Sequence, residues 1–320
     1  MWLELLLGLV THPGYDFPLP TGHRFPATKF SQLMTILAQD GVLKGFTQYQ
    51  PGALTAKDLS VVHCPIYVSS FLNGTLSAEA MRVLGLNWSE ELRNRSLLAP
   101  AGTLKAARLA LIDGIACHAA GGTHHAHYNH GAGYCVFNDL AYAARQLVNE
   151  AIVEQVLIFD CDVHQGDGTA QIFASDDRIF TCSLHCRSNY PTRRALSDLD
   201  VEIEIGTGDD AYLKILEDTL ILIKDRGLQP DLVLYDAGVD VHVDDSLGRL
   251  ALSNAGIRAR DEMVIRHFRG QNCAVATVIG GGYGPNIEEL ALRHSQVFRA
   301  ALAVEGAIGD RLMIENLAQE

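Results

Sequence analysis

Residues 156–163 read VLIFDCDV, an apolar run whose end carries two aspartates. Three further runs are just as apolar and rich in β-branched residues: 179–185 (IFTCSLH), 232–236 (LVLYD) and 274–279 (AVATVI). None of the four alternates cleanly between apolar and polar residues, which is typical of strands covered on both faces in a parallel sheet. These segments therefore predict the centre of the fold.

The segments between these strands have the periodicity of helices. Residues 212–226 place four aliphatic side chains on one stripe, and residues 254–269 and 287–302 have similar patterns. Strands that alternate with helices predict one doubly wound α/β domain, which we expect to occupy residues 1–320 as a single unit. The opening MWLELLLGLV predicts a first buried strand, because it lacks the basic start and small-residue cleavage site of a signal peptide.

Composition narrows the class of protein. The hydrophobic fraction of 48% allows a large buried core. The net charge of −13 argues against direct nucleic-acid binding and suits a cationic or neutral substrate better. The seven cysteines are an odd number without C-x-x-C spacing, as expected in a reducing compartment. No apolar run reaches the roughly 18 residues of a membrane span. We therefore expect a cytoplasmic protein that does not bind membranes, with its oligomeric state left open.

Polar residues cluster where the predicted strands end, namely at residues 160–164, 183–185, 236–245 and 280–283. In open α/β sheets, ligands bind beyond the carboxyl ends of the strands. In the first cluster, alternation along an extended chain puts Asp160, Asp162 and His164 on the same side. A metal site is one interpretation, and two strand-end acids with a structural histidine are the other. The apolar strand favours a metal, because buried charges need partners.

A third metal ligand should come from residues 236–248 (DAGVDVHVDDSLG). The candidates are Asp240, His242, Asp244 and Asp245, and spacing alone does not choose among them; a solvated acidic loop is the alternative. Three protein ligands and an open position are typical of catalytic zinc. Water in that position has a pKa lowered toward ~7.

Four histidines lie within residues 124–130. They could form a solvated loop or bind a metal themselves. A third interpretation makes His124 and His125 general acid/base groups that activate a metal-bound water and protonate the leaving amine. Each then needs a carboxylate behind its other nitrogen, and Asp160 and Asp167 are available. We favour this interpretation because it also accounts for those acids.

Residues 280–284 read GGGYG. The glycines permit close approach of a ligand, and Tyr283 could donate to a developing oxyanion. A flexible turn with a packed tyrosine is the alternative. A phosphate-binding loop fits poorly, because no G-K-[ST] follows. The GAGY segment at residues 131–134 could be a turn or the wall of a channel.

Taken together, these segments resemble the zinc-dependent histone deacetylase superfamily of amidohydrolases, in particular its class IV and bacterial branch. The resemblance runs from His12 to about Ser295. Its motifs are GGTHHA, GAGYCVFND, DCDVHQGDG, SLH, DAGVDVHVDDSLG and GGGYG. The resemblance implies a three-layer αβα domain with a central, mostly parallel eight-stranded sheet. Gln165 departs from the family, where many members have a second histidine.

The resemblance also implies roles for individual residues. The zinc ligands would be Asp162, His164 and Asp245, with Asp240 as the fallback for the third, and Fe²⁺ could replace zinc. A structural potassium would be held by Asp160, Ser183 and Leu184 with the backbone of Asp162 and His164. The catalytic residues would be His124, His125, Tyr283, Asp160 and Asp167. The substrate would contact Gly133, Tyr134 and Gly282, and Arg24 would lie in an internal cavity near the leaving acetate.

The expected activity is hydrolysis of the amide bond in an acylated lysine peptide or a small acylated amine. One alternative is an arginase-like binuclear hydrolase, with Asp236, Asp240, His242 and Asp244 as the extra metal-facing candidates. The other is a non-catalytic protein that binds an acyl ligand. That alternative is disfavoured, because the ligands and Tyr283 are all present.

Overall fold

The computed structural model describes the backbone of residues 6–317 and the side chains of residues 6–309. Its centre is an eight-stranded sheet with the order β2-β1-β3-β8-β7-β4-β5-β6. Every neighbouring pair is parallel. The α/β class is therefore confirmed, and the sheet is parallel throughout. The strands are β1 (Leu7–Val10), β2 (Phe46–Tyr49), β3 (Ile115–His118), β4 (Val156–Asp160), β5 (Ile179–Cys186), β6 (Leu199–Ile203), β7 (Leu232–Asp236) and β8 (Ala274–Val278).

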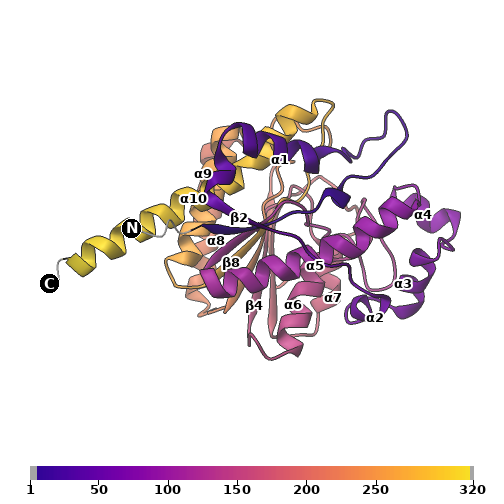
Figure 1. Cartoon of the computed structure of the whole chain (residues 1–320), viewed down its shortest axis with the longest axis horizontal. Coiled ribbons are helices and arrows are strands. Elements are labelled where there is room, and N and C mark those ends of the chain that lie inside the picture. The colour runs from indigo at the N-terminus through magenta and orange to yellow at the C-terminus, as the bar shows by residue number, and fades with distance from the viewer. Residues whose placement is uncertain (1–5, 318–320) are drawn as a thin grey trace.

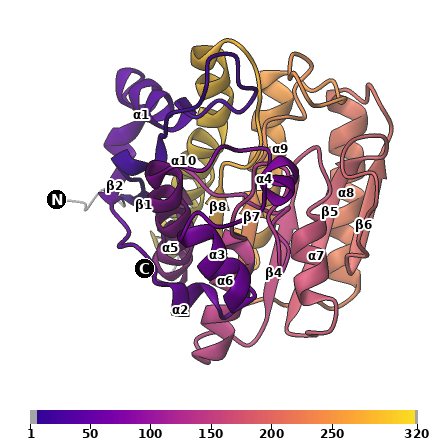
Figure 2. The same cartoon turned by 90° about the vertical axis from the view of Figure 1, so that its right-hand side faces the viewer.

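Helices cover both faces of the sheet (Figures 1 and 2). One layer contains α1 (Lys29–Gln39), α8 (Asp209–Asp225), α9 (Asn254–Arg269) and α10 (Ile287–Leu317). The other contains α5 (Glu90–Asp113), α6 (Asp139–Asn149) and α7 (Asp167–Phe173). The short helices α2 (Ala56–Leu59), α3 (Pro65–Leu72) and α4 (Ala78–Leu84) lie outside this second layer, at the right of Figure 1. The 3₁₀ turns are η1 (Pro13–Tyr15) and η2 (Val42–Gly45).

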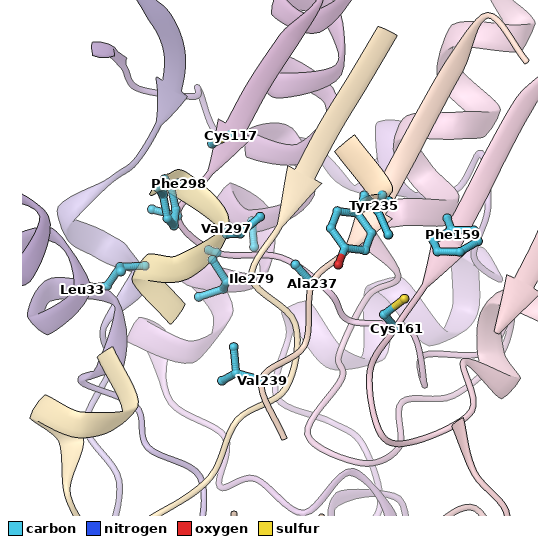
Figure 3. Close-up of a cluster of buried hydrophobic side chains, with 14 of the residues drawn as sticks. Leu33, Cys117, Phe159, Cys161, Tyr235, Ala237, Val239, Ile279, Val297 and Phe298 are labelled. Carbon is cyan, nitrogen blue, oxygen red and sulfur yellow. The ribbon is translucent and has the colours of Figure 1, made fainter. Parts of the chain in front are cut away.

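The two layers follow from the alternation of side chains along each strand. In β4, Leu157 and Phe159 belong to the hydrophobic cluster under the first layer, whereas Val156 and Ile158 belong to the cluster under the second. Figure 3 shows part of the first cluster, with strand residues beside Phe298 of α10. All these side chains are at most 2% exposed, and burial of each contributes roughly 1.5–3 kcal/mol.

Several element boundaries match the sequence prediction and others differ. The ranges of β7 and α9 are those predicted, and β1 confirms a first buried strand, while residues 1–5 lie outside the described residues. Strand β4 ends at Asp160, three residues before the predicted end. Helix α10 continues to Leu317, and its C-terminal part projects from the body in Figure 1. No helix within residues 6–317 is long and apolar enough to span a membrane.

The early end of β4 has a local cause. The amide of Asp162 donates to Asp160 Oδ1 at 3.0 Å, and the amide of His164 donates to Asp162 Oδ1 at 2.9 Å. These amides bond to carboxylates two residues back instead of to a neighbouring strand. Such local bonds compete with the sheet. The chain therefore bends at the point where its polar side chains begin.

Candidate active site and metal centre

The loops that follow four adjacent strands meet at one edge of the sheet. The strands are β3, β8, β7 and β4, which lie side by side in the middle of the sheet. Their loops carry, in that order, the histidine pair, residues 280–283, residues 237–248 and residues 161–166. This is the edge where a parallel sheet binds its ligands.

A compact group of metal-capable donors lies at this edge. Atoms of Asp162, His164 and Asp240 all lie within 4.8 Å of one another, and the three residues are buried. His164 Nδ1 is 2.9 Å from Asp162 Oδ1 and 3.1 Å from Asp240 Oδ2. Burial alone would lower the pKa of His164, but the bonds to the two carboxylates raise it to about 10. The His164 imidazole thus lies between two buried carboxyl groups, and a divalent metal could bind the same three side chains in place of the shared proton.

The backbone leaves room for this donor group. Gly281 donates its amide to Asp162 Oδ2 at 2.7 Å. A Cβ on Gly281 would overlap the carboxylates of both Asp162 and Asp240. The glycine is therefore required by close packing against the donors, and a metal bound by carboxylate and imidazole ligands is compatible with the residues present.

Asp245 is placed beside this group but is not part of it. Its Oδ1 accepts the amides of Leu247 and Gly248 at 2.8 and 2.9 Å, and its Oδ2 accepts the amide of Tyr283 at 2.7 Å. Burial raises the pKa of Asp245 to about 6. The three amides hold its carboxylate in one orientation next to Tyr283.

The other candidates for the third ligand are placed differently. Asp240 is fully buried, and its Oδ1 accepts the amide of Val163 at 2.8 Å. Asp244 is 69% exposed and lies 3.4 Å from Arg293. His242 accepts the amide of Asp244 through Nδ1. His242 and Asp244 therefore do not join the donor group.

Each histidine of the pair lies against the acid that the sequence analysis assigned to it. His124 Nδ1 is 2.7 Å from Asp160 Oδ2, and His125 Nδ1 is 2.6 Å from Asp167 Oδ1. His124 Nε2 lies 3.8 Å from Asp162 Oδ1. The acids therefore occupy the Nδ1 atoms and leave both Nε2 atoms available on the side of the site.

The two histidines have opposite electrostatic environments. Burial lowers the pKa of both, but the charges of Asp160 and Asp162 raise the pKa of His124 well above its ordinary value. For His125, burial and the adjacent His124 lower the pKa to about 4 despite the bond to Asp167. Neighbouring groups whose pKa values are driven apart are suited to separate acid and base roles.

Asp236 is a buried acid whose side-chain environment the sequence did not reveal. Neither carboxylate oxygen has a hydrogen-bond partner among residues 6–309, and Oδ2 lies 4.0 Å from His124 Nδ1. Burial and the charge of Asp160 raise the pKa of Asp236 well above its ordinary value. His124, Asp160 and Asp236 form a second group of metal-capable donors.

A hollow of roughly 380 Å³ opens above the histidines and is lined by three tyrosines. The ring of Tyr190 lies 4.8 Å from that of His125, and the rings of Tyr134 and Tyr283 are 5.9 Å apart. Gly133 adopts φ +53° where a side chain would collide with His125. Gly133 and Tyr134 therefore form a wall of the hollow. Tyr190 was missed, because no motif surrounds it in the sequence.

A smaller inner cavity is lined by His124 and His125 and by two buried cationic side chains, Lys29 and Arg95. Lys29 donates to the carbonyl of Gly280 at 3.0 Å, and burial lowers its pKa to about 8. Arg24, which the resemblance placed in such a cavity, is instead exposed and lines a separate surface hollow. The prediction that Arg24 lies in the internal cavity is therefore wrong. Lys29, in the first turn of α1, points into that cavity instead.

Two further residues named in the sequence analysis are Gly282, which was expected to contact the substrate, and Gln165, which departs from the family. Gly282 packs against His294 and Val239, whereas its neighbours Gly281 and Tyr283 line the cavities. Gln165 donates to Ala195 and Asp200, away from the donor group.

The residues expected at a potassium site lie on adjacent strands. Asp160 and Ser183 are register partners between β4 and β5. Ser183 Oγ lies 3.0 Å from His185 Nδ1, and Leu184 is fully buried in the same strand. These residues are close enough together to be considered as a potassium site, and potassium binding by them is a proposal.

The fold and this site define an α/β protein with a candidate metal centre at the carboxyl edge of a parallel sheet. The chain belongs to the histone deacetylase domain family, whose model matches residues 23–300.

Relatives support this membership. The chain is 46% identical to an uncharacterized protein of Picosynechococcus over 92% of this chain and 97% of that protein. It is 32% identical to histone deacetylase 2 of Arabidopsis thaliana over 82% of this chain and 70% of that one. It is 28% identical to the acetoin utilization protein AcuC of Staphylococcus aureus over 71% of this chain and 64% of that protein. The crystal structure of the HDA15 HD domain has the same fold, with a TM-score of 0.74, 20% identity and 99% coverage of both chains.

Proposed function

We propose that the protein is a zinc-dependent deacylase that hydrolyses the amide bond of an N-acylated lysine or a related acylated amine, with the whole chain as one catalytic domain. One observation carries this proposal. The two buried His–Asp pairs lie beside the Asp162–His164 donors, and His125 and His164 line a hollow together with three tyrosines. This arrangement provides a base, an acid, an oxyanion donor and metal ligands at one point.

The zinc ligands in this proposal are Asp162, His164 and Asp245. Asp245 is preoriented by three amides and retains free lone pairs on its carboxylate. Asp240 is the fallback: its Oδ2 lies 3.1 Å from His164 Nδ1 in the compact donor group, and it accepts a single amide, that of Val163. Fe²⁺ fits the same ligands, since carboxylate and imidazole discriminate weakly between the two ions.

A zinc ion at this centre supplies a Lewis acid that polarises the acyl carbonyl and lowers the pKa of a nearby water. His125 lines both cavities, and its free Nε2 can accept the proton of the attacking water. Asp167 fixes the tautomer of His125. The hydroxyl of Tyr283 donates to the oxygen that becomes negative. His125 then returns the proton to the departing amine.

The remaining assigned residues support this chemistry. His124, bonded to Asp160, contributes positive charge beside the reacting carbonyl. Lys29 and Arg95 make the inner cavity suitable for the carboxylate product. A structural potassium held by Asp160, Ser183 and Leu184 with nearby carbonyls would stabilise the loop that begins at Asp160.

The test uses the purified full chain with acetyl-lysine peptides, longer acyl-lysine peptides and acetylpolyamines. We expect hydrolysis that is lost after chelation and restored by Zn²⁺, with one zinc per chain. Hydrolysis that survives complete removal of metal would contradict zinc dependence. A zinc-loaded protein that hydrolyses no substrate of the panel would favour a non-catalytic acyl-binding protein.

A second candidate is a binuclear hydrolase similar to arginases. The observation that favours it is the second donor group, His124, Asp160 and Asp236. In the deacylase proposal His124 is a positively charged side chain that Asp160 orients, and in the binuclear proposal both residues hold a metal. Two manganese ions per chain, with activity that requires both, would support the second candidate.

A further inference from the structure

Of the side chains that the structure describes, two arginines and no acid line the hollow. Arg82 and Arg249 both line it, and none of its other lining residues is an aspartate or a glutamate. Both arginines are exposed, and neither forms an ion pair with an acid among residues 6–309. Both arginines that line the hollow are therefore positive and unpaired there, although the chain as a whole has a net charge of −13.

The fold places each arginine near one of the tyrosines that line the hollow. Arg82 lies in the last turn of α4, where the carbonyl of Leu84 accepts the amide of Tyr134 at 2.8 Å. The next residue, Gly85, packs directly against the ring of Tyr134. This contact holds the end of α4, and therefore Arg82, at the mouth.

Arg249 is held at the mouth by the loop that carries Tyr190. Its Nη1 donates to the carbonyl of Ser188 at 3.1 Å, and Asn189 donates to the carbonyl of Leu247 at 2.8 Å. One guanidinium nitrogen is thus used to position the side chain, and the remaining N–H groups are available to a ligand.

A third arginine increases the positive charge nearby. Arg24 lines the adjacent surface hollow, which shares Leu247 and Tyr283 with the main hollow. The guanidinium groups around the entrance can bind a carboxylate in the fork geometry that arginine favours. The same charges would repel a cationic group on an entering substrate.

We infer that the substrate is an acylated amine that carries a carboxylate at the end of its chain remote from the amide. Arg82 and Arg249 act as specificity-determining residues that bind this carboxylate while the acyl end reaches the histidines. The inference rests on the proposed deacylase function and names its substrate class. From the net charge we expected a cationic or neutral substrate, and the inference reverses that expectation. The arginines at the mouth lie close to the bound substrate, whereas most other charges of the chain are farther away and are screened by salt.

The test compares three acetylated substrates with the same chain length and different terminal charges: N-acetyl-aminohexanoate, its carboxamide and N-acetyl-hexanediamine. For the zinc-loaded parent protein, we expect kcat/KM to be highest for the carboxylate and lowest for the cation. The carboxylate-to-cation ratio should be on the order of ten, and added salt should reduce it.

Arginine variants test whether Arg82 and Arg249 cause the preference for the carboxylate substrate. Arg82→Gln and Arg249→Gln should each lower the carboxylate-to-carboxamide ratio of kcat/KM about two- to fivefold, and Arg82→Glu should favour the cation. The control is Arg266→Gln, which removes an exposed arginine from α9 and should leave the ratio at the parental value. An acetylated lysine peptide with a flanking glutamate, set against its glutamine counterpart, shows whether a peptide carboxylate serves equally well.

The possible failures are distinct. A parent that hydrolyses all three substrates with equal kcat/KM, or arginine variants that lower all three equally, would overturn the inference and leave the deacylase proposal intact. A zinc-loaded parent that hydrolyses none of the acylated substrates, peptides included, would overturn both.

Discussion

The Nδ1 atom of His125 lies 2.6 Å from Oδ1 of Asp167, and the other oxygen of this carboxylate lies 3.3 Å from Nε2 of His127. The carboxylate is mostly buried, and the nearby imidazoles lower its pKa below the ordinary range despite the opposing effect of burial. Asp167 therefore stays ionised and orients the ring of His125, so that its Nε2 is free at the floor of the hollow.

Asp167→Asn should reduce kcat ten- to hundredfold, because an amide at this position no longer favours the tautomer with a proton on Nδ1 of His125. The matched control is His127→Gln, which removes the second partner of the same carboxylate outside the hollow. Steady-state kinetics should show a large loss for the first variant and little change for the second. Equal losses of kcat in the two variants would mean that Asp167 stabilises the loop that carries both histidines and does not act specifically through His125.

Tyr283→Phe should lower kcat by about 10²–10³, the usual cost of one oxyanion donor. Because the ring still packs against Tyr134, the melting temperature should stay close to that of the parent. Unchanged turnover would remove Tyr283 from the proposed mechanism.

Asp245→Asn should weaken zinc binding by at least tenfold, whereas Asp240→Asn should weaken it less. The measurement is zinc content after dialysis against a graded chelator series, with folding checked by circular dichroism. The reverse order of the two variants would identify Asp240 as the third ligand.

Gly133→Ala should reduce both stability and activity. The residue has φ +53°, so a side chain costs about 1–2 kcal/mol in backbone strain, and its Cβ would displace His125. Gly206→Ala is the matched control, since Gly206 has φ +75° with nothing within 4 Å of an added Cβ. The control should show the loss of stability without the loss of activity.

His63 should make stability depend on pH. The amide of Asn138 donates to its Nε2 at 2.9 Å, so Nδ1 carries the proton and bonds to the carbonyl of His127. Burial lowers the pKa of His63 from 6.5 to about 4. The unfolded chain therefore binds more protons between these values, and stability is lost as pH falls from 6.5 to about 4, by at most about 3 kcal/mol.

Denaturant unfolding of the parent and of His63→Gln at several pH values between 4 and 7 measures this contribution. The difference in unfolding free energy between the two proteins should shrink in magnitude or change sign as pH falls. A difference that is constant with pH would show that His63 does not titrate as proposed.

The sequence by itself indicated the first strand, the four strands β4, β5, β7 and β8, the helices α8, α9 and α10, and most of the polar residues of the candidate site. Apolar runs without alternation predicted strands covered on both faces, and β7 has the predicted range because all of its residues are buried. The grouping of Asp162 with His164 was also predictable, since they are two residues apart on one chain. Local spacing decides such features, and no distant contact is needed to infer them.

Only the tertiary structure decided which distant residues share a cavity. Lys29 and Arg95 come from different helices, and they rather than Arg24 reach the inner cavity. Tyr190, Arg82 and Arg249 meet at the outer hollow in the same way.

The physical reason lies in the sheet. Its order joins strands that are far apart in the chain, so the loops that meet at the carboxyl edge are set by strand packing and not by spacing in the sequence. The charge at the mouth, and with it the substrate class inferred here, follows from that packing.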